Sequence, residues 1–266
     1  MGTATKRIAR RAEAREGLDR IFKQPDLVRI IHYSCESFYD RLEATSPRIT
    51  SVAVRNLGSA QTVSFSIHLV AERQGIAFDK IVVNYDKLEK AMLDDFYSYV
   101  KQNSNSKWLH WNMRDINYGF LALEHRYRVL KGSPIVIPGV QLFDMAACLV
   151  DIYGPSYIPN PRMQRIMEFN QISSRHFLSG AEEANAFTKG DYVKLHQSTL
   201  KKVDIISHLA ERQWNGTLRT KAGRVEQYGN SVVGLVELVT DHWLYKVAGF
   251  VGIVASVAGI LLALHH

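Results

Sequence analysis

The feature that most constrains this chain is a run of eighteen uncharged residues near its carboxyl end, at positions 247–264. As an α-helix the run would extend about 27 Å, which is close to the hydrocarbon thickness of a bilayer. Trp243 and Tyr245 precede it where an interfacial aromatic belt would lie, and Lys246 marks the water side. The run predicts a single-pass transmembrane helix. The alternative is a buried core helix, although a core helix of this length usually has a polar face.

The charges beside the run predict its orientation. Basic residues at 219–224 precede the run, and no Lys or Arg follows it. The positive-inside tendency then keeps the body in the cytoplasm, as a tail-anchored protein of the inner (cytoplasmic) membrane. Small residues recur at four-residue steps, which favours a homo-oligomer built through the transmembrane helix; Gly and Ala are also simply common in such helices. These positions are Ala248, Gly252 and Ser256 on one stripe and Ala255, Gly259 and Ala263 on another.

The net charge of +7 over 266 residues is concentrated in two segments. Residues 1–24 hold seven basic and three acidic side chains, and residues 200–224 hold six and two, so each segment carries +4 and the remainder −1. Such segments suit the phosphates of nucleic acid or an anionic membrane. The alternative for the N-terminal segment is a solvated helix face. Cys35 and Cys148 are the two cysteines, which excludes a disulfide-stapled scaffold.

The periodicity of the body predicts an α/β domain with a mixed sheet. Three strands come first, the second and third joined by a turn at 58–60, and are followed by a helix, a short strand and further helices. The expected strands are 27–33, 49–57, 62–70 and 109–111, and the expected helices are 86–100, with Asp86 as its cap, 115–129, 141–153, 161–169 and 191–211. The expected division is a basic arm (1–24), an α/β domain (25–212), a basic, amphipathic connector (213–246) and the transmembrane helix (247–264).

Three motifs lie in order along this domain: YSCESFY at 33–39, WLHWNMRDINYGFLALEHR at 108–126 and GDYVKLHQSTLKKVDIISHL at 190–209. With the elements between them, they resemble the DEDD 3′–5′ exonuclease superfamily of the RNase H-like fold. The resemblance covers roughly residues 27–212. It implies an RNase H-like mixed sheet with flanking helices, and a metal-dependent 3′–5′ exonuclease if the chain is active.

The resemblance also implies a catalytic set, Glu36, Asp115 and Asp204, in which Glu36 and Asp204 hold Mg²⁺ or Mn²⁺. Two-metal hydrolysis needs several carboxylates converging on one point. The sequence departs from the family pattern, because Ser34 stands where the first Asp is expected and Leu200 where a Tyr is expected. Asp115 also follows Asn112 by three residues, where the family usually leaves four. The alternative roles of the three acids are helix capping and surface salt bridges.

The segment after the fourth expected strand predicts a nucleic-acid contact, because α/β folds place sites at the carboxyl ends of strands. Asn112, Arg114 and Asn117 suit a phosphate or a base edge, and Trp111 suits base stacking. The alternative is that Arg114 and Asp115 pair with Glu124 or Arg126 and that Trp111 belongs to the core.

Together these patterns predict a membrane-tethered, exonuclease-like protein that binds nucleic acid, with altered or lost catalysis. The alternative is an oligomeric membrane-perturbing effector, such as a toxin or an antiviral defence protein. In that case the exonuclease-like body is a regulatory module that binds a partner protein. The sequence has no CxxC, HExxH, GxSxG or P-loop motif, which excludes the corresponding zinc, hydrolase and nucleotide sites.

Overall fold

A five-stranded mixed sheet forms the centre of the protein in a computed structural model, which describes residues 3–36, 46–115 and 117–223. The strand order is β3-β2-β1-β4-β5. The pairs β3–β2 and β2–β1 are antiparallel, whereas β1–β4 and β4–β5 are parallel. The strands are β1 (Val28–Cys35), β2 (Ile49–Asn56), β3 (Thr62–Ser66), β4 (Lys107–His110) and β5 (Leu142–Asp144). The predicted α/β class and mixed sheet are confirmed, and the strand order is consistent with an RNase H-like fold.

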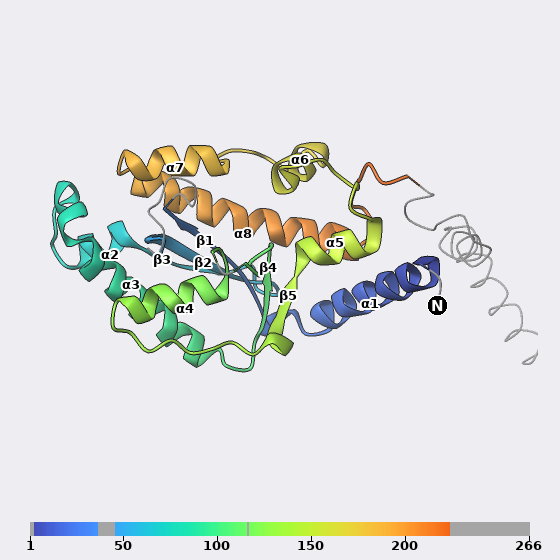
Figure 1. Ribbon diagram of the computed structural model, residues 1–266, viewed down its shortest axis with the longest axis horizontal. Coiled ribbons are helices and arrows are strands. Elements are labelled where there is room, and N and C mark those ends of the chain that lie inside the picture. Colours follow the sequence, from blue (N-terminus) through green and yellow to red (C-terminus); the bar gives the residue numbers. More distant parts are fainter. Residues whose placement is uncertain (1–2, 37–45, 116, 224–266) are drawn as a thin grey trace, which may run out of the picture.

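Helices cover both faces of the sheet (Figure 1). On one face α3 and α4 enclose a core with Ile31, Tyr33 and Val52. On the other, α1, α5 and α8 enclose a core with Ile30 and Leu109. The helices are α1 (Thr3–Lys23), α2 (Ile67–Arg73), α3 (Tyr85–Gln102), α4 (Phe120–Val129), α5 (Met145–Tyr153), α6 (Arg162–Phe169), α7 (Gly180–Thr188) and α8 (Tyr192–Trp214). Short 3₁₀ turns lie at Pro25–Leu27, Phe78–Lys80, Val82–Asn84 and Gly139–Gln141.

The central strand β1 is buried on both faces because its side chains alternate between the two cores. This explains why VRIIHYSC is a nearly continuous apolar run, as expected of an interior strand. The predicted hairpin is confirmed, since β2 and β3 pair antiparallel across the turn after Asn56.

Two expected elements have different boundaries. The third strand ends at Ser66, and the rest of the expected strand begins α2, because Ile67, Val70 and Ala71 recur at helical spacing and are buried together. The helix expected at 141–153 is instead β5 followed by α5. The Asp144 carboxylate ends the strand by accepting hydrogen bonds from the backbone N–H groups of Ala146 and Ala147, which caps α5.

Two helices also differ from the expectation. α4 begins at Phe120 rather than 115, because residues 111–115 and 117–119 are irregular and are held by side-chain hydrogen bonds. α7 was not expected; Ser179 and Glu182 form a capping box at its start.

The basic N-terminal segment is part of the folded body. Helix α1 packs against α5 and α8, and Leu18 and Ile21 are buried in the core beside them. The expected boundary at residue 24 falls just after α1, and α1 packs into the same core as the domain that follows it.

A buried ion pair joins α3 to α4. The Glu89 carboxylate, which is 0% exposed, accepts hydrogen bonds from Arg126 Nε at 2.9 Å and from the backbone N–H of Ile49 at 2.7 Å. Arg126 also contacts Asp86 at 2.7 Å. Asp86 therefore pairs with Arg126 in the first turn of α3, and Asn84, rather than Asp86, occupies the capping position.

The predicted transmembrane helix at 247–264 and most of the expected connector lie outside the described residues. Within residues 3–36, 46–115 and 117–223, no helix has the length and apolar character needed to cross a bilayer.

Candidate functional site

A pocket of about 480 Å³ lies beyond the carboxyl end of β4, beside His32 of the neighbouring parallel strand β1 at the centre of the sheet. Open α/β sheets bind their ligands at such an edge. The sheet contributes His32, and the loop after β4 contributes Trp111, Asn112 and Tyr118. The opposite wall includes Phe177 and Ser179 from the segment before α7, Glu183 from α7 and Lys202 from α8.

A buried polar network connects this pocket to the sheet. The Ser34 hydroxyl lies 2.8 Å from the hydroxyl of Thr199 and donates a hydrogen bond of 3.1 Å to Glu183. Thr199 lies 2.6 Å from the hydroxyl of Ser51, so α8 is bound to both β1 and β2. The Ser198 hydroxyl donates to the same oxygen of Glu183 at 2.9 Å. Ser34, the residue in the place of the first expected Asp, is therefore a buried member of a hydroxyl network.

Lys202 and Glu183 form an ion pair at the inner wall of the pocket. The Lys202 ammonium lies 2.7 Å from Glu183 Oε1, and both side chains are largely buried. The ammonium also lies 5.5 Å from the centre of the Phe177 ring. Because the two charges neutralise each other, this wall is polar but carries no net charge.

His32 and Tyr118 form a neutral aromatic part of the wall. The Tyr118 hydroxyl donates to the Tyr33 carbonyl at 3.1 Å and also lies within 3.2 Å of the His32 ring. Burial lowers the pKa of His32 well below its usual value, and the nearby Lys202 charge lowers it further. Burial likewise raises the pKa of Tyr118. Both rings are therefore uncharged at neutral pH.

The loop that carries Trp111 and Asn112 is fixed by Asp144. One oxygen of Asp144 accepts a hydrogen bond from the backbone N–H of Asn112 at 3.0 Å, and the other lies 2.6 Å from Arg114 Nε. Asn112 has a φ of 53°, a left-handed conformation that Asn tolerates better than most residues. His110 accepts a hydrogen bond from the Met113 N–H at 3.2 Å.

Glu36 lies in a different cavity. Its carboxylate is bound by Arg48 Nη2 at 3.1 Å and Nε at 3.3 Å. This hydrogen bonding raises the pKa of the Arg48 guanidinium, while burial opposes the increase. The two residues line a cavity of about 600 Å³ together with the carboxyl end of α7 and with Tyr192 at the start of α8. Glu36 therefore has the salt-bridge partner that the alternative interpretation expected.

Asp204 lies far from Glu36. It is twelve residues along α8 from Tyr192, a rise of about 18 Å. It also follows Lys202 by two residues, so it is on the side of α8 away from the pocket. Lys201 lies 2.7 Å from its carboxylate, and His208 lies 3.5 Å away.

Asp115 is exposed and accepts a hydrogen bond from the backbone N–H of Asn117 at 2.7 Å. The three predicted catalytic acids are thus not brought to one point. Among the residues that the structure describes, no group of three or more His, Cys, Asp or Glu side chains is arranged to hold a metal ion. The donor set does not fit the Mg²⁺ or Mn²⁺ site that the resemblance implied.

Of the four predicted nucleic-acid residues, two lie together at the pocket. Trp111 and Asn112 line the pocket, and Trp111, at 8% exposure, also belongs to the core. Arg114 is exposed and bound to Asp144, rather than to Glu124 as the alternative proposed. Asn117 contributes its backbone to the turn with Asp115.

Sequence reasoning missed His32, Tyr118, Phe177, Glu183 and Lys202. Glu183 lies on the unexpected helix α7, and Lys202 appeared only as one charge of a basic segment. The sequence signal that could have indicated these residues is Ser34, which replaces the Asp of the family pattern. A Ser at that position indicates surroundings that differ from those of a metal site. Comparison with protein-family models, curated proteins and solved structures finds no match to this chain.

Proposed function

We propose that the protein binds nucleic acid, and that the pocket beyond β1 and β4 receives an unstacked base of a single strand. The observation that carries this proposal is the character of the pocket, which combines aromatic rings with polar groups and has no net charge on its inner wall. A volume of about 480 Å³ is in the range that holds a small organic ligand. Base–aromatic stacking binds single strands with little dependence on sequence.

The pocket offers both contacts that an unstacked base needs. Trp111, Tyr118 and Phe177 present aromatic surface. Asn112 Oδ1 accepts a hydrogen bond from Arg114, and Gln164 Nε2 donates one to Glu168. The NH₂ group of Asn112 and the amide oxygen of Gln164 remain to match a base edge. The proposed function is binding rather than two-metal hydrolysis, because Glu36, Glu183 and Asp204 each contact a basic side chain. No metal-dependent step is part of this function.

Changing Asn112 to glycine is expected to weaken binding roughly tenfold, because it removes the amide and leaves the left-handed backbone unstrained. Fluorescence anisotropy of labelled single-stranded DNA and RNA, in EDTA, measures the effect on the full chain in neutral nanodiscs. Gln171→Gly is the matched control, since Gln171 has a φ of 54° and is exposed outside the pocket. Equal weakening by both variants contradicts the proposal. The proposal is also contradicted if the labelled DNA or RNA is shortened in Mg²⁺ or Mn²⁺ and Asp204→Ala abolishes the shortening.

We also propose that residues 247–264 tether the protein to the inner membrane, with the α/β body in the cytoplasm. Deleting 247–266 is expected to move the protein from the carbonate-resistant membrane fraction to the supernatant. Ile253→Arg should weaken insertion, because a charge at the centre of a transmembrane helix costs about 2.5–3.5 kcal/mol, whereas Ile253→Leu should not. A truncated chain that remains in the membrane fraction contradicts this tether.

The same run of residues supports a second candidate function, that of an oligomeric effector which perturbs the membrane while its body binds a partner protein. The small-residue stripes of the run are the observation that favours it. This function predicts that expression depolarises the membrane. The depolarisation should persist in Asn112→Gly and be lost on deleting 247–266, which distinguishes this function from nucleic-acid binding.

A further inference from the structure

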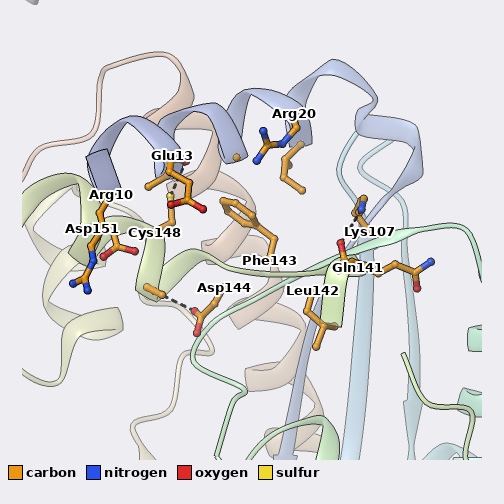
Figure 2. A pocket seen from close by; sticks show the side chains of 15 residues that line it. Arg10, Glu13, Arg20, Lys107, Gln141, Leu142, Phe143, Asp144, Cys148 and Asp151 are labelled. Atoms are coloured by element: carbon orange, nitrogen blue, oxygen red, sulfur yellow. Dashed lines mark hydrogen bonds between the residues drawn. The ribbon is translucent and has the colours of Figure 1, made fainter. Parts of the chain in front are cut away.

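A third cavity lies between helix α1 and the edge of the sheet, away from the two already described. Its volume is about 580 Å³, and its walls come from α1, from β5 and from the start of α5 (Figure 2). Within the described residues β5 is the last strand of the sheet, so the cavity lies at a sheet edge. We call this cavity the α1–β5 groove.

The floor of the groove is apolar. Phe143 projects from β5 into the space below α1, and Leu142, Ala147 and Ile21 line the same space. The Phe143 ring packs closely under α1 because Gly17 has no side chain; a Cβ atom there would lie 3.0 Å from the edge of the ring. The ring is therefore a fixed apolar wall of the groove.

The ends of the groove differ in charge. Figure 2 shows Arg20 and Lys107 toward one end, whereas Arg10, Glu13 and Asp151 lie toward the other. At the second end, burial raises the pKa of Asp151 while the charge of Arg10 opposes the increase. One basic and two acidic side chains meet there, so this end has no excess positive charge.

The end with Arg20 and Lys107 keeps donors for a ligand. The Lys107 ammonium donates one hydrogen bond of 2.8 Å to the Val140 carbonyl, which leaves two of its three protons. Arg20 contacts Glu16 at 2.7 Å in an exposed pair, a type of pair that contributes little to stability. A carboxylate entering this end would meet the Lys107 ammonium and the Arg20 guanidinium, which also contacts Glu16, at the mouth of an apolar space.

We propose that the α1–β5 groove binds a small amphiphilic anion, with its apolar body against Phe143 and its carboxylate between Arg20 and Lys107. The volume is in the range of sites for small organic ligands. The site is separate from the proposed base-binding pocket, and its ligand is of a different chemical class.

The test uses the full chain in nanodiscs of a neutral lipid and 4-(4-fluorophenyl)butanoate as the probe, followed by ¹⁹F NMR line broadening. The corresponding alcohol, which has the same body without the charge, is titrated in parallel. The expected result is saturable binding of the carboxylate that is ~10-fold tighter than binding of the alcohol. Equal affinity for the two probes overturns the assignment of the charged end.

Two sets of variants locate the site. Arg20→Gln with Lys107→Gln should weaken carboxylate binding ~10-fold and leave alcohol binding unchanged. Arg73→Gln with Lys80→Gln removes the same charge from exposed positions outside the groove and should change neither. Ala147→Leu fills the floor and should abolish binding of both probes, with the melting temperature confirming that the variant is folded. Equal weakening by the two charge pairs, or binding retained in a folded Ala147→Leu protein, overturns the proposal.

Discussion

Replacing Glu89 with alanine is expected to lower the free energy of unfolding by about 3–5 kcal/mol, the usual cost of breaking a buried ion pair from one side. Glu89 is fully buried, and its removal leaves the Arg126 guanidinium and the backbone N–H of Ile49 without the carboxylate that binds them. Asp86 still contacts Arg126, but its side chain is exposed and replaces only part of that interaction.

Urea unfolding followed by far-ultraviolet circular dichroism measures the loss. The matched control is Glu168→Ala, which removes an acid from the exposed pair with Arg165 and is expected to cost less than about 1 kcal/mol. Glu89→Gln keeps the shape and some of the hydrogen bonds, so its stability should fall between that of the wild type and that of Glu89→Ala. Similar losses for Glu89→Ala and Glu168→Ala would show that the ion pair contributes no more than a surface contact.

Acidification from pH 6.5 to pH 4 is expected to destabilise the fold through its buried histidines, which are His32, His110 and His196. Burial lowers the pKa of His110 to about 4, and the positive charge of Arg114 adds to this while Asp144 opposes it. Burial and the neighbouring His68 lower the pKa of His196 to about 4. Because the unfolded histidines titrate near 6.5, the unfolded state binds more protons between these values, and stability falls as the pH falls. His110 and His196 each account for about 3 kcal/mol once the pH is below 4.

The variant His196→Gln isolates one of these contributions. Unfolding free energies at pH 4.5, 5.5, 6.5 and 7.5 should depend less on pH in this variant than in the wild type, because one proton-binding group of the unfolded state has been removed. His125→Gln is the matched control, since it makes the same substitution at an exposed histidine. An unchanged dependence in His196→Gln would show that His196 binds its proton equally in both states.

The sequence was most informative where one local pattern decides the structure. The apolar run of β1, the turn at 58–60 and the long amphipathic helices α3 and α8 are examples, because each buries a face that its own residues define. The strand β5 has three residues and is held by pairing with β4, so nothing within it distinguishes it from the start of α5. The transmembrane helix at 247–264 stays a prediction.

The candidate site was harder to predict because it depends on contacts between distant segments. Ser34 meets Thr199 across 165 positions of sequence and Glu183 across 149. The motif comparison placed Asp204 at the site, whereas the helix turns Lys202, two residues earlier, toward the pocket. Trp111 and Asn112 were predicted because they follow a strand directly, and the end of a strand is a position that the sequence does specify.

Asp144 is common to the proposed base-binding pocket and the α1–β5 groove. Its carboxylate holds the backbone of Asn112 at the pocket and caps α5, and the residue also lines the groove. A ligand in the groove that displaces this carboxylate therefore changes the free energy of binding at the pocket, and a ligand in the pocket changes the free energy of binding at the groove. Linkage then requires the effect to be reciprocal, so the factor by which an amphiphile alters affinity for a nucleic acid equals the factor by which the nucleic acid alters affinity for the amphiphile.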